Sequence, residues 1–231
     1  MRTLYLWKND IIQIVRDPIM RLMCVAPLLL LVVFKAIVVW LVPLIVTETG
    51  LDLYQYTDYM LVFVLLMVAG MSGIVTGFMM LDEKDGRIAE LLSVTPLGQG
   101  YLVNRLLFSG CLTTVYSLMA YYVLSVSRLP FPALVFLTVA LALYSAVIGL
   151  LLFNKADDKV KGLTLAKGLN LLNLFAFADL FGLSWLSAMA KIFPSYWLMA
   201  LVRTPCSLEP YLMVFISLAL WLGWLIYRRR V

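Results

Sequence analysis

The sequence contains no histidine, and only 13% of its 231 residues are Asp, Glu, Lys or Arg. Histidine is a common general base and metal ligand, so its absence leaves few ways to build a catalytic site. The three cysteines, Cys24, Cys111 and Cys206, are odd in number and far apart, which predicts neither a disulfide framework nor a metal site. No Gly-rich phosphate loop ending in Lys-Ser or Lys-Thr is present. ATP chemistry, if the protein uses it, must therefore come from another chain.

What the chain does have is apolar sequence: 64% of its residues are hydrophobic. A soluble core cannot bury that much apolar surface, and roughly 20 apolar residues cross a bilayer as a helix. The composition therefore predicts an all-α polytopic membrane protein, with residues 1–231 forming a single transmembrane domain. We expect six transmembrane helices, at about 21–43, 58–81, 101–125, 132–153, 162–186 and 210–227.

The basic residues predict the orientation, because Lys and Arg concentrate in cytoplasmic loops. With both termini inside, the inner side holds 14 of the 18: Arg2, Lys8, Arg16, Arg21, Lys84, Arg87, Arg105, Lys155, Lys159, Lys161, Lys167, Arg228, Arg229 and Arg230. The outer side holds Arg128, Lys191 and Arg203, and Lys35 lies within the first span. Topology and lipid headgroups account for the basic net charge, so nucleic acid is not an expected partner.

The first 20 residues alternate apolar and charged side chains, among them Trp7, Ile11 and Ile14 with Lys8 and Asp10. This pattern predicts a helix in the membrane plane, with Trp7 near the headgroups. A long apolar run without a small-residue cleavage site follows, so we do not expect a signal peptide.

A charged island at residues 82–96, DEKDGRIAELLSVTP, separates two strongly apolar runs. Ile88, Leu91 and Leu92 share one helical face. Outside that stripe lie Glu83, Lys84, Asp85, Arg87 and Glu90. Asp85 is suited to cap the start of a short helix, and Thr95-Pro96 to end it. Such a helix either rests on headgroups or docks a soluble partner.

Two further patterns concern the spans themselves. Ala69, Gly73 and Gly77 form a small-residue ladder that favours close helix packing within the chain, a contact with another subunit, or the wall of a cavity. A polar stripe on the fifth span consists of Lys167, Asn170 and Asn173, followed by Phe177 on the same face. It indicates either a surface turned to a cavity or a partner helix, or a buried hydrogen-bond network between helices.

The island resembles the cytosolic coupling helix of ABC-2-type exporter permeases, in which charged residues and a glycine precede Glu, aliphatics and Thr-Pro. The matching positions are Glu83, Lys84, Gly86, Glu90, Leu92, Val94, Thr95 and Pro96. Arg16-Asp17-Pro18 and the apolar run with Pro27 are similar to the end of that family's N-terminal elbow helix, here residues 1–20, and the start of its first span. The segment 184–205, with Ile192 to Trp197, resembles its outer re-entrant helices. The Glu-Lys-Asp run, Val-Thr-Pro-Leu and Tyr-Leu resemble small drug-export members of the fluoroquinolone type.

The resemblance implies a permease subunit that moves an amphipathic substrate or drug outward across the cytoplasmic membrane of a prokaryote. A separate ATP-binding-cassette ATPase would supply ATP and magnesium and dock on Glu83, Asp85, Arg87, Ile88, Glu90, Leu91 and Leu92. A second permease half, identical or related, would complete a dimer. The second and fifth spans would border the translocation path between the two halves, which would be lined by Lys167, Asn170, Asn173 and Phe177. Two other classes stay open: a membrane receptor or scaffold without a transport cycle, and an intramembrane enzyme.

Overall fold

The computed structural model describes residues 2–50, 52–85 and 98–228, and these residues form helices and turns without a β-strand. Helices satisfy the backbone N–H and C=O groups within one segment, which a bilayer requires. Six helical segments are long and apolar enough to cross a membrane: Pro18–Thr49, Tyr54–Lys84, Leu102–Leu124, Phe131–Lys155, Lys159–Phe181 and Leu208–Leu225. The prediction of an all-α polytopic membrane protein with six spans is confirmed.

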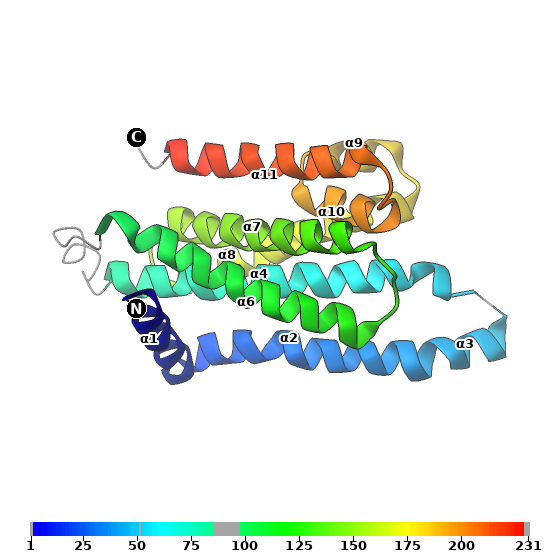
Figure 1. The fold of residues 1–231 in the computed structure, drawn as a ribbon, viewed down its shortest axis with the longest axis horizontal. Coiled ribbons are helices and arrows are strands. Elements are labelled where there is room, and N and C mark those ends of the chain that lie inside the picture. The colour runs from blue at the N-terminus through cyan, green and yellow to red at the C-terminus, as the bar shows by residue number, and fades with distance from the viewer. Residues whose placement is uncertain (1, 51, 86–97, 229–231) are drawn as a thin grey trace.

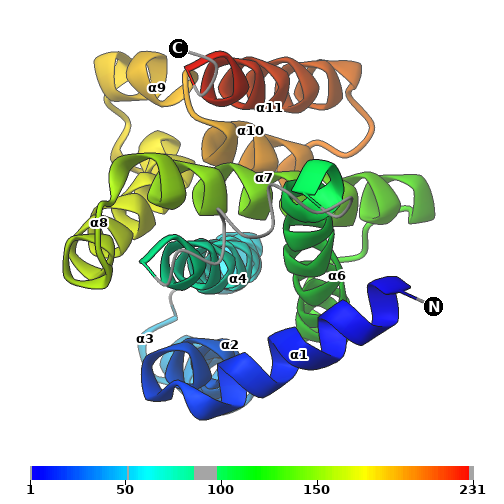
Figure 2. The same ribbon diagram turned by 90° about the vertical axis from the view of Figure 1, so that its left-hand side faces the viewer.

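The first helix, α1 (Arg2–Arg16), lies across one end of the bundle instead of along it (Figure 2). We call this the α1 end; it also holds the starts of α2, α6 and α8 and the ends of α4, α7 and α11 (Figure 1). The opposite end is the far end. The in-plane segment is shorter than the expected 1–20, because Asp17 caps α2 (Pro18–Ala36) and Pro18 occupies its first turn. Trp7 packs edge-on against Phe108 of α6, with the ring centroids 6.1 Å apart.

The first span is longer than predicted. After α2 the chain continues through a π-helical turn, η1 (Ile37–Leu41), into α3 (Val42–Thr49). Pro43 has no N–H and crowds the carbonyl four residues before it, and a π-turn is one way to insert that proline without ending the helix. Gly50, in the left-handed conformation with φ 70°, then ends α3.

Helix α4 (Thr57–Asp85), which follows the short η2 (Tyr54–Tyr56), is the centre of the molecule. It packs against α2, α6 (Gly98–Leu124), α7 (Phe131–Lys155) and α8 (Lys159–Leu171), which surround it in Figure 2. Its most apolar window is 83% buried, whereas that of the first span is only 11% buried. A helix that is apolar all round belongs in a core, so α4 is the inner helix and α2 faces outward.

The fifth span ends earlier than the predicted 162–186. It consists of α8 and a tighter 3₁₀ segment, η3 (Leu172–Phe181), which stops where Gly182 adopts a φ of 63°. Without a Cβ, glycine takes this left-handed conformation at no steric cost, so the chain turns there.

Two short helices, α9 (Ser184–Ala190) and α10 (Pro194–Arg203), follow and are bent by 107° at the break between them. They lie beside α11 (Leu208–Arg228) in both ribbon views (Figures 1 and 2). Trp221 of α11 donates a hydrogen bond from Nε1 to the carbonyl of Ile192, in the turn between α9 and α10. That turn therefore packs alongside α11.

Candidate functional site

Two ion-pair clusters join the helices at the α1 end. In the first, the Arg105 guanidinium of α6 pairs with Asp10 of α1 through Nη1 and with Glu83 of α4 through Nη2. The three side chains are only 8%, 4% and 10% exposed. A planar guanidinium can bind two carboxylates at once, because its N–H donors point in fixed directions. The N–H donors of a lysine ammonium rotate and orient their partners less strictly. One buried arginine thus connects three helices.

This first cluster has one more negative than positive group. Burial raises the pKa of Asp10 above its ordinary value, although the charge and hydrogen bond of Arg105 oppose that rise. Asp10 Oδ2 and Glu83 Oε2 are buried without a hydrogen-bond partner among the described residues. Buried charges are costly to desolvate, so the arrangement is weak as a source of stability but sensitive to the loss of any one partner.

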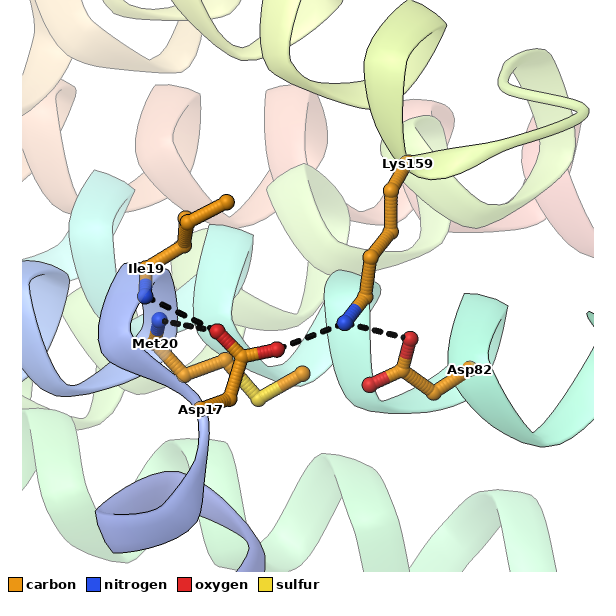
Figure 3. Close-up of polar contacts among 5 residues, drawn as sticks. All are labelled: Asp17, Ile19, Met20, Asp82 and Lys159. Carbon is orange, nitrogen blue, oxygen red and sulfur yellow. Dashed lines mark hydrogen bonds and ion pairs between the residues drawn. The ribbon is translucent and has the colours of Figure 1, made fainter.

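The second cluster centres on Lys159, at the start of α8 (Figure 3). Its Nζ lies 2.6 Å from Asp17 Oδ2 and 2.7 Å from Asp82 Oδ1. Asp17 Oδ1 accepts from the backbone N–H groups of Ile19 at 2.8 Å and Met20 at 3.3 Å. Burial alone would raise the pKa of Asp17, but the hydrogen bonds from Lys159 and from the two N–H groups outweigh it and lower that pKa.

The two clusters meet at the end of α4, because Asp82 and Glu83 are adjacent residues there. Asp82 connects α4 to α8 and, through Asp17, to the junction of α1 and α2. Glu83 connects α4 to α6 and, through Arg105, to the middle of α1. The last turn of α4, which leads directly into residues 86–97, is thus fixed to four other helices.

The structure changes the predicted start of the charged island. Residues 82–85 continue α4, so Asp85 lies in the last turn of α4. Glu83, expected among the docking residues, is buried in the Arg105 cluster. Arg87, Ile88, Glu90, Leu91 and Leu92 lie outside the described residues, as does the rest of the predicted coupling helix beyond Asp85.

Most of the polar stripe of the fifth span packs inside the chain. The Tyr144 hydroxyl of α7 donates to Asn173 Oδ1 at 2.8 Å, and Phe177 lies against Phe63 and Tyr59 of α4. Asn170 and Asn173 both face Gly70, where an added Cβ would come within 2.9 Å of Asn170 Oδ1 and 3.4 Å of Asn173 Nδ2. Lys167, in contrast, is exposed. In the single chain, the two asparagines and Phe177 therefore face α4.

The small-residue ladder faces α7. A Cβ at Gly73 would lie 2.3 Å from the Ser145 carbonyl oxygen, and one at Gly77 would lie 2.6 Å from Leu152 Cδ2. Ala69, one rung earlier, is fully buried. The structure thus places the ladder at a contact within the chain, which was one of the alternatives.

The sequence patterns did not single out Asp10, Asp17, Arg105 or Lys159 as partners. One signal could have found the first of them: Asp10 lies three residues after Trp7 and four before Ile14, on the apolar face of α1. A carboxylate on a buried face requires a cation, but the sequence alone does not say which one.

Comparison with known proteins gives consistent results. A family described as "Fluoroquinolones export permease protein Rv2686c-like" matches residues 10–227. Two similar proteins, from Mycobacterium tuberculosis strains CDC 1551 / Oshkosh and ATCC 25618 / H37Rv, are each named as a fluoroquinolones export permease protein. Each is 29% identical over 202 residues, covering 82% of this chain and 77% of the relative. No solved structure matches the chain.

Proposed function

Since the chain belongs to the Rv2686c-like family of fluoroquinolones export permeases, we propose that it is the membrane subunit of an ATP-driven drug exporter. In this proposal the α1 end is cytoplasmic, a separate ATP-binding-cassette ATPase binds ATP and magnesium, and a second permease half completes the dimer. The substrate is an amphipathic drug of the fluoroquinolone type, expelled across the cytoplasmic membrane. The family match, which spans nearly the whole chain, carries the proposal.

The distribution of basic residues supports the orientation. The α1 end holds Lys8, Arg16, Arg21, Lys84, Arg105, Lys155, Lys159 and Lys161. Away from the α1 end, the basic residues in or beside connecting segments of the described chain are Arg128, Lys191 and Arg203. Lys and Arg in short loops are retained on the cytoplasmic side, so this asymmetry favours a cytoplasmic α1 end.

The two ion-pair clusters support a coupling role for residues 86–97. A partner that moves this segment pulls directly on the last turn of α4, which Asp82 and Glu83 fix to α1, α2, α6 and α8. Because α4 is the central helix, a displacement of its end changes the packing of the whole bundle. The position of the segment thus suits the transfer of force from an ATPase to the spans.

The test uses the double variant Glu90→Ala with Leu91→Ala. Truncating an interface leucine costs on the order of 1–3 kcal/mol, and the loss of a desolvated charge pair can cost more. We expect the double variant to insert normally but to lose co-purification of the ATPase, detected by mass spectrometry, and to lose fluoroquinolone efflux from cells.

The matched control is Glu48→Ala with Leu44→Ala, which removes the same residue types from the exposed α3 at the far end. It should keep both the ATPase and the efflux. If the Glu90 and Leu91 variant retains a full complement of ATPase and normal efflux, residues 86–97 do not couple to an ATPase. If the wild-type chain itself binds no ATPase and exports nothing, a receptor or scaffold becomes the better description.

A further inference from the structure

A groove lies between the α9–α10 turn and the outward face of α11. Its volume is about 680 Å³, within the range of roughly 300–1,000 Å³ that is typical of small-molecule sites. It is lined by Lys191, Ile192, Trp197, Met213, Ile216, Ser217, Leu220, Trp221 and Trp224. The walls are therefore mostly apolar and aromatic, with one cationic side chain.

The groove lies at the depth of the bilayer interior. Trp221, which hydrogen-bonds to the Ile192 carbonyl at 3.3 Å, is 13 residues beyond Leu208, the first residue of α11. At a rise of 1.5 Å per residue it lies roughly 20 Å along the helix, well inside a hydrocarbon core of about 30 Å. Figures 1 and 2 both show the α9–α10 segment beside α11. The α9–α10 turn consequently carries Lys191 deep into the membrane.

The turn is held in place by two tryptophans. Trp197 Nε1 donates to the Lys191 carbonyl at 2.7 Å, and Trp221 Nε1 donates to the next carbonyl, that of Ile192. Both indoles thereby satisfy backbone acceptors that lipid could not satisfy. The groove is thus preformed by the fold, and the rings of Trp221 and Trp224, with centroids 6.2 Å apart, form part of its wall.

Lys191 has no ion-pair partner among the described residues, and its side chain is exposed at the groove. A cation inside a membrane is costly, and such residues commonly mark substrate or ion pathways. An anionic group bound in the groove would neutralise this charge, while a flat aromatic body would cover the tryptophan and aliphatic wall. Charge and shape together therefore define one class of ligand.

We infer that this groove is a binding site for the exported drug, which is a planar aromatic molecule whose carboxylate pairs with Lys191. Its rings pack against the groove wall that includes Trp221 and Trp224, whose own rings are set at 76° to each other. The inference rests on the proposed export function and specifies the chemistry of its substrate. A ligand that reaches the protein from the lipid phase can enter such a groove directly, because α11 exposes Ile216 and Leu220 beside it.

The test measures binding of a radiolabelled fluoroquinolone and of its carboxylate methyl ester. The full-length chain is purified and placed in nanodiscs of phosphatidylcholine. The wild type should bind the acid more tightly than the ester. Lys191→Gln should weaken binding of the acid roughly tenfold, equivalent to about 1.4 kcal/mol, and leave the ester unchanged. Lys191→Arg should preserve the preference for the acid.

Trp224→Ala should weaken binding of the acid and the ester alike, because it removes part of the apolar wall. The controls are Arg128→Gln, which removes an exposed cation from the α6–α7 loop, and Trp40→Ala, which removes a tryptophan that is 75% exposed on η1. Both should bind as the wild type does. Circular dichroism and size-exclusion profiles check that all variants keep their helical fold.

Equal affinity of the wild type and Lys191→Gln for the acid would overturn the inference. So would a finding that the groove variants change only the binding of phosphatidylglycerol, or only the association of two copies of the chain. If cells still export the drug while Lys191→Gln has no effect, the site is wrong but the export function stands. If the wild type neither binds nor exports any fluoroquinolone, the proposed substrate fails and the site fails with it.

Discussion

Single residues at the α1 end show how few polar contacts position the helices. Arg105 is one of only 18 basic residues in the chain, yet it pairs with carboxylates on two other helices. Buried side chains with unmatched charge are expensive, so each of the three groups depends on the other two. Lys159 also connects three segments, but its side chain is 36% exposed, so solvent screens its ion pairs. The Arg105 cluster is therefore the more sensitive of the two.

Arg105→Leu should accordingly destabilise the protein strongly. It leaves Asp10 and Glu83 buried near each other without a cation, and loss of one partner of such a group typically costs about 3–5 kcal/mol. Unfolding of the detergent-solubilised protein by added denaturant measures this change. Arg128→Leu, at an exposed position outside any cluster, should change the free energy of unfolding by about 0.5 kcal/mol or less.

The triple variant Arg105→Leu, Asp10→Asn and Glu83→Gln separates charge from packing. Because it removes all three charges together, it should recover a large part of the stability that Arg105→Leu loses. Equal instability of the single and triple variants would mean that Arg105 acts through the packing of its side chain and not through its charge.

At the scale of elements, the contact of α4 with α7 depends on missing side chains. Gly73 on α4 and Gly149 on α7 face each other, with the Gly73 carbonyl oxygen 2.9 Å from the position of a Cβ on Gly149. In lipid, where the hydrophobic effect does not drive helices together, such close approach supplies the attraction through van der Waals contact. The ladder thus holds the central helix against its main neighbour.

Gly73→Ala tests this contact. The new methyl group would begin 2.3 Å from the Ser145 carbonyl oxygen, a backbone atom that can only move together with α7. Overpacking of this kind usually costs about 1–3 kcal/mol, so the free energy of unfolding should fall by that amount. The matched control is Gly168→Ala on α8, where no described residue beyond the neighbouring helix backbone comes within 4 Å of the new methyl group. It should be neutral or stabilising, since alanine favours helix more than glycine does. Equal effects at the two sites would refute the close-packing account.

The elements also show which features the sequence could predict. Spans of uniform apolar character, such as α7 and α11, were placed within a few residues because hydropathy alone sets their length. Two span limits were not predicted: the first span continues beyond Pro43, and the fifth ends early, at Gly182. Both depend on the local backbone conformation, which cannot be inferred from hydropathy. The position of the α9–α10 turn alongside α11 depends on a hydrogen bond between Trp221 and Ile192, which are 29 positions apart, so no local pattern predicts it.

The candidate site was less predictable than the spans. Asp10 and Arg105 are separated by 95 positions, and Asp17 and Lys159 by 142, so no local pattern connects them. The polar stripe of the fifth span could be recognised in the sequence, but the sequence did not show which helix the stripe contacts. Only the packing of α8 and η3 on α4 shows that Asn173 faces inward. The partners in these ion pairs and hydrogen bonds are set by how the helices pack, and the periodicity of apolar residues does not predict that packing.

At the scale of the whole molecule, the bundle is electrostatically asymmetric. Both ion-pair clusters and most of the basic residues belong to the α1 end, whereas the bent pair α9 and α10 lies alongside α11 (Figure 1). An ATPase requires its contacts in the cytoplasm, and a drug released outward must leave at the opposite side. The proposed function therefore requires a single orientation, with the α1 end inside.

Cysteine accessibility decides that orientation. Cys206 is free, exposed and located in the short loop between α10 and α11 at the far end. In a Cys24→Ser, Cys111→Ser background, we expect Cys206 to react with a membrane-impermeant maleimide added outside intact cells. A cysteine introduced by Ser93→Cys, in the segment proposed to meet the ATPase, should react only after the cells are opened. The positive-inside distribution of Lys and Arg is the physical reason for this expectation. Labelling of Ser93→Cys from outside, with Cys206 protected, would place the coupling segment on the side that has no ATP and would contradict the ATP-driven export mechanism.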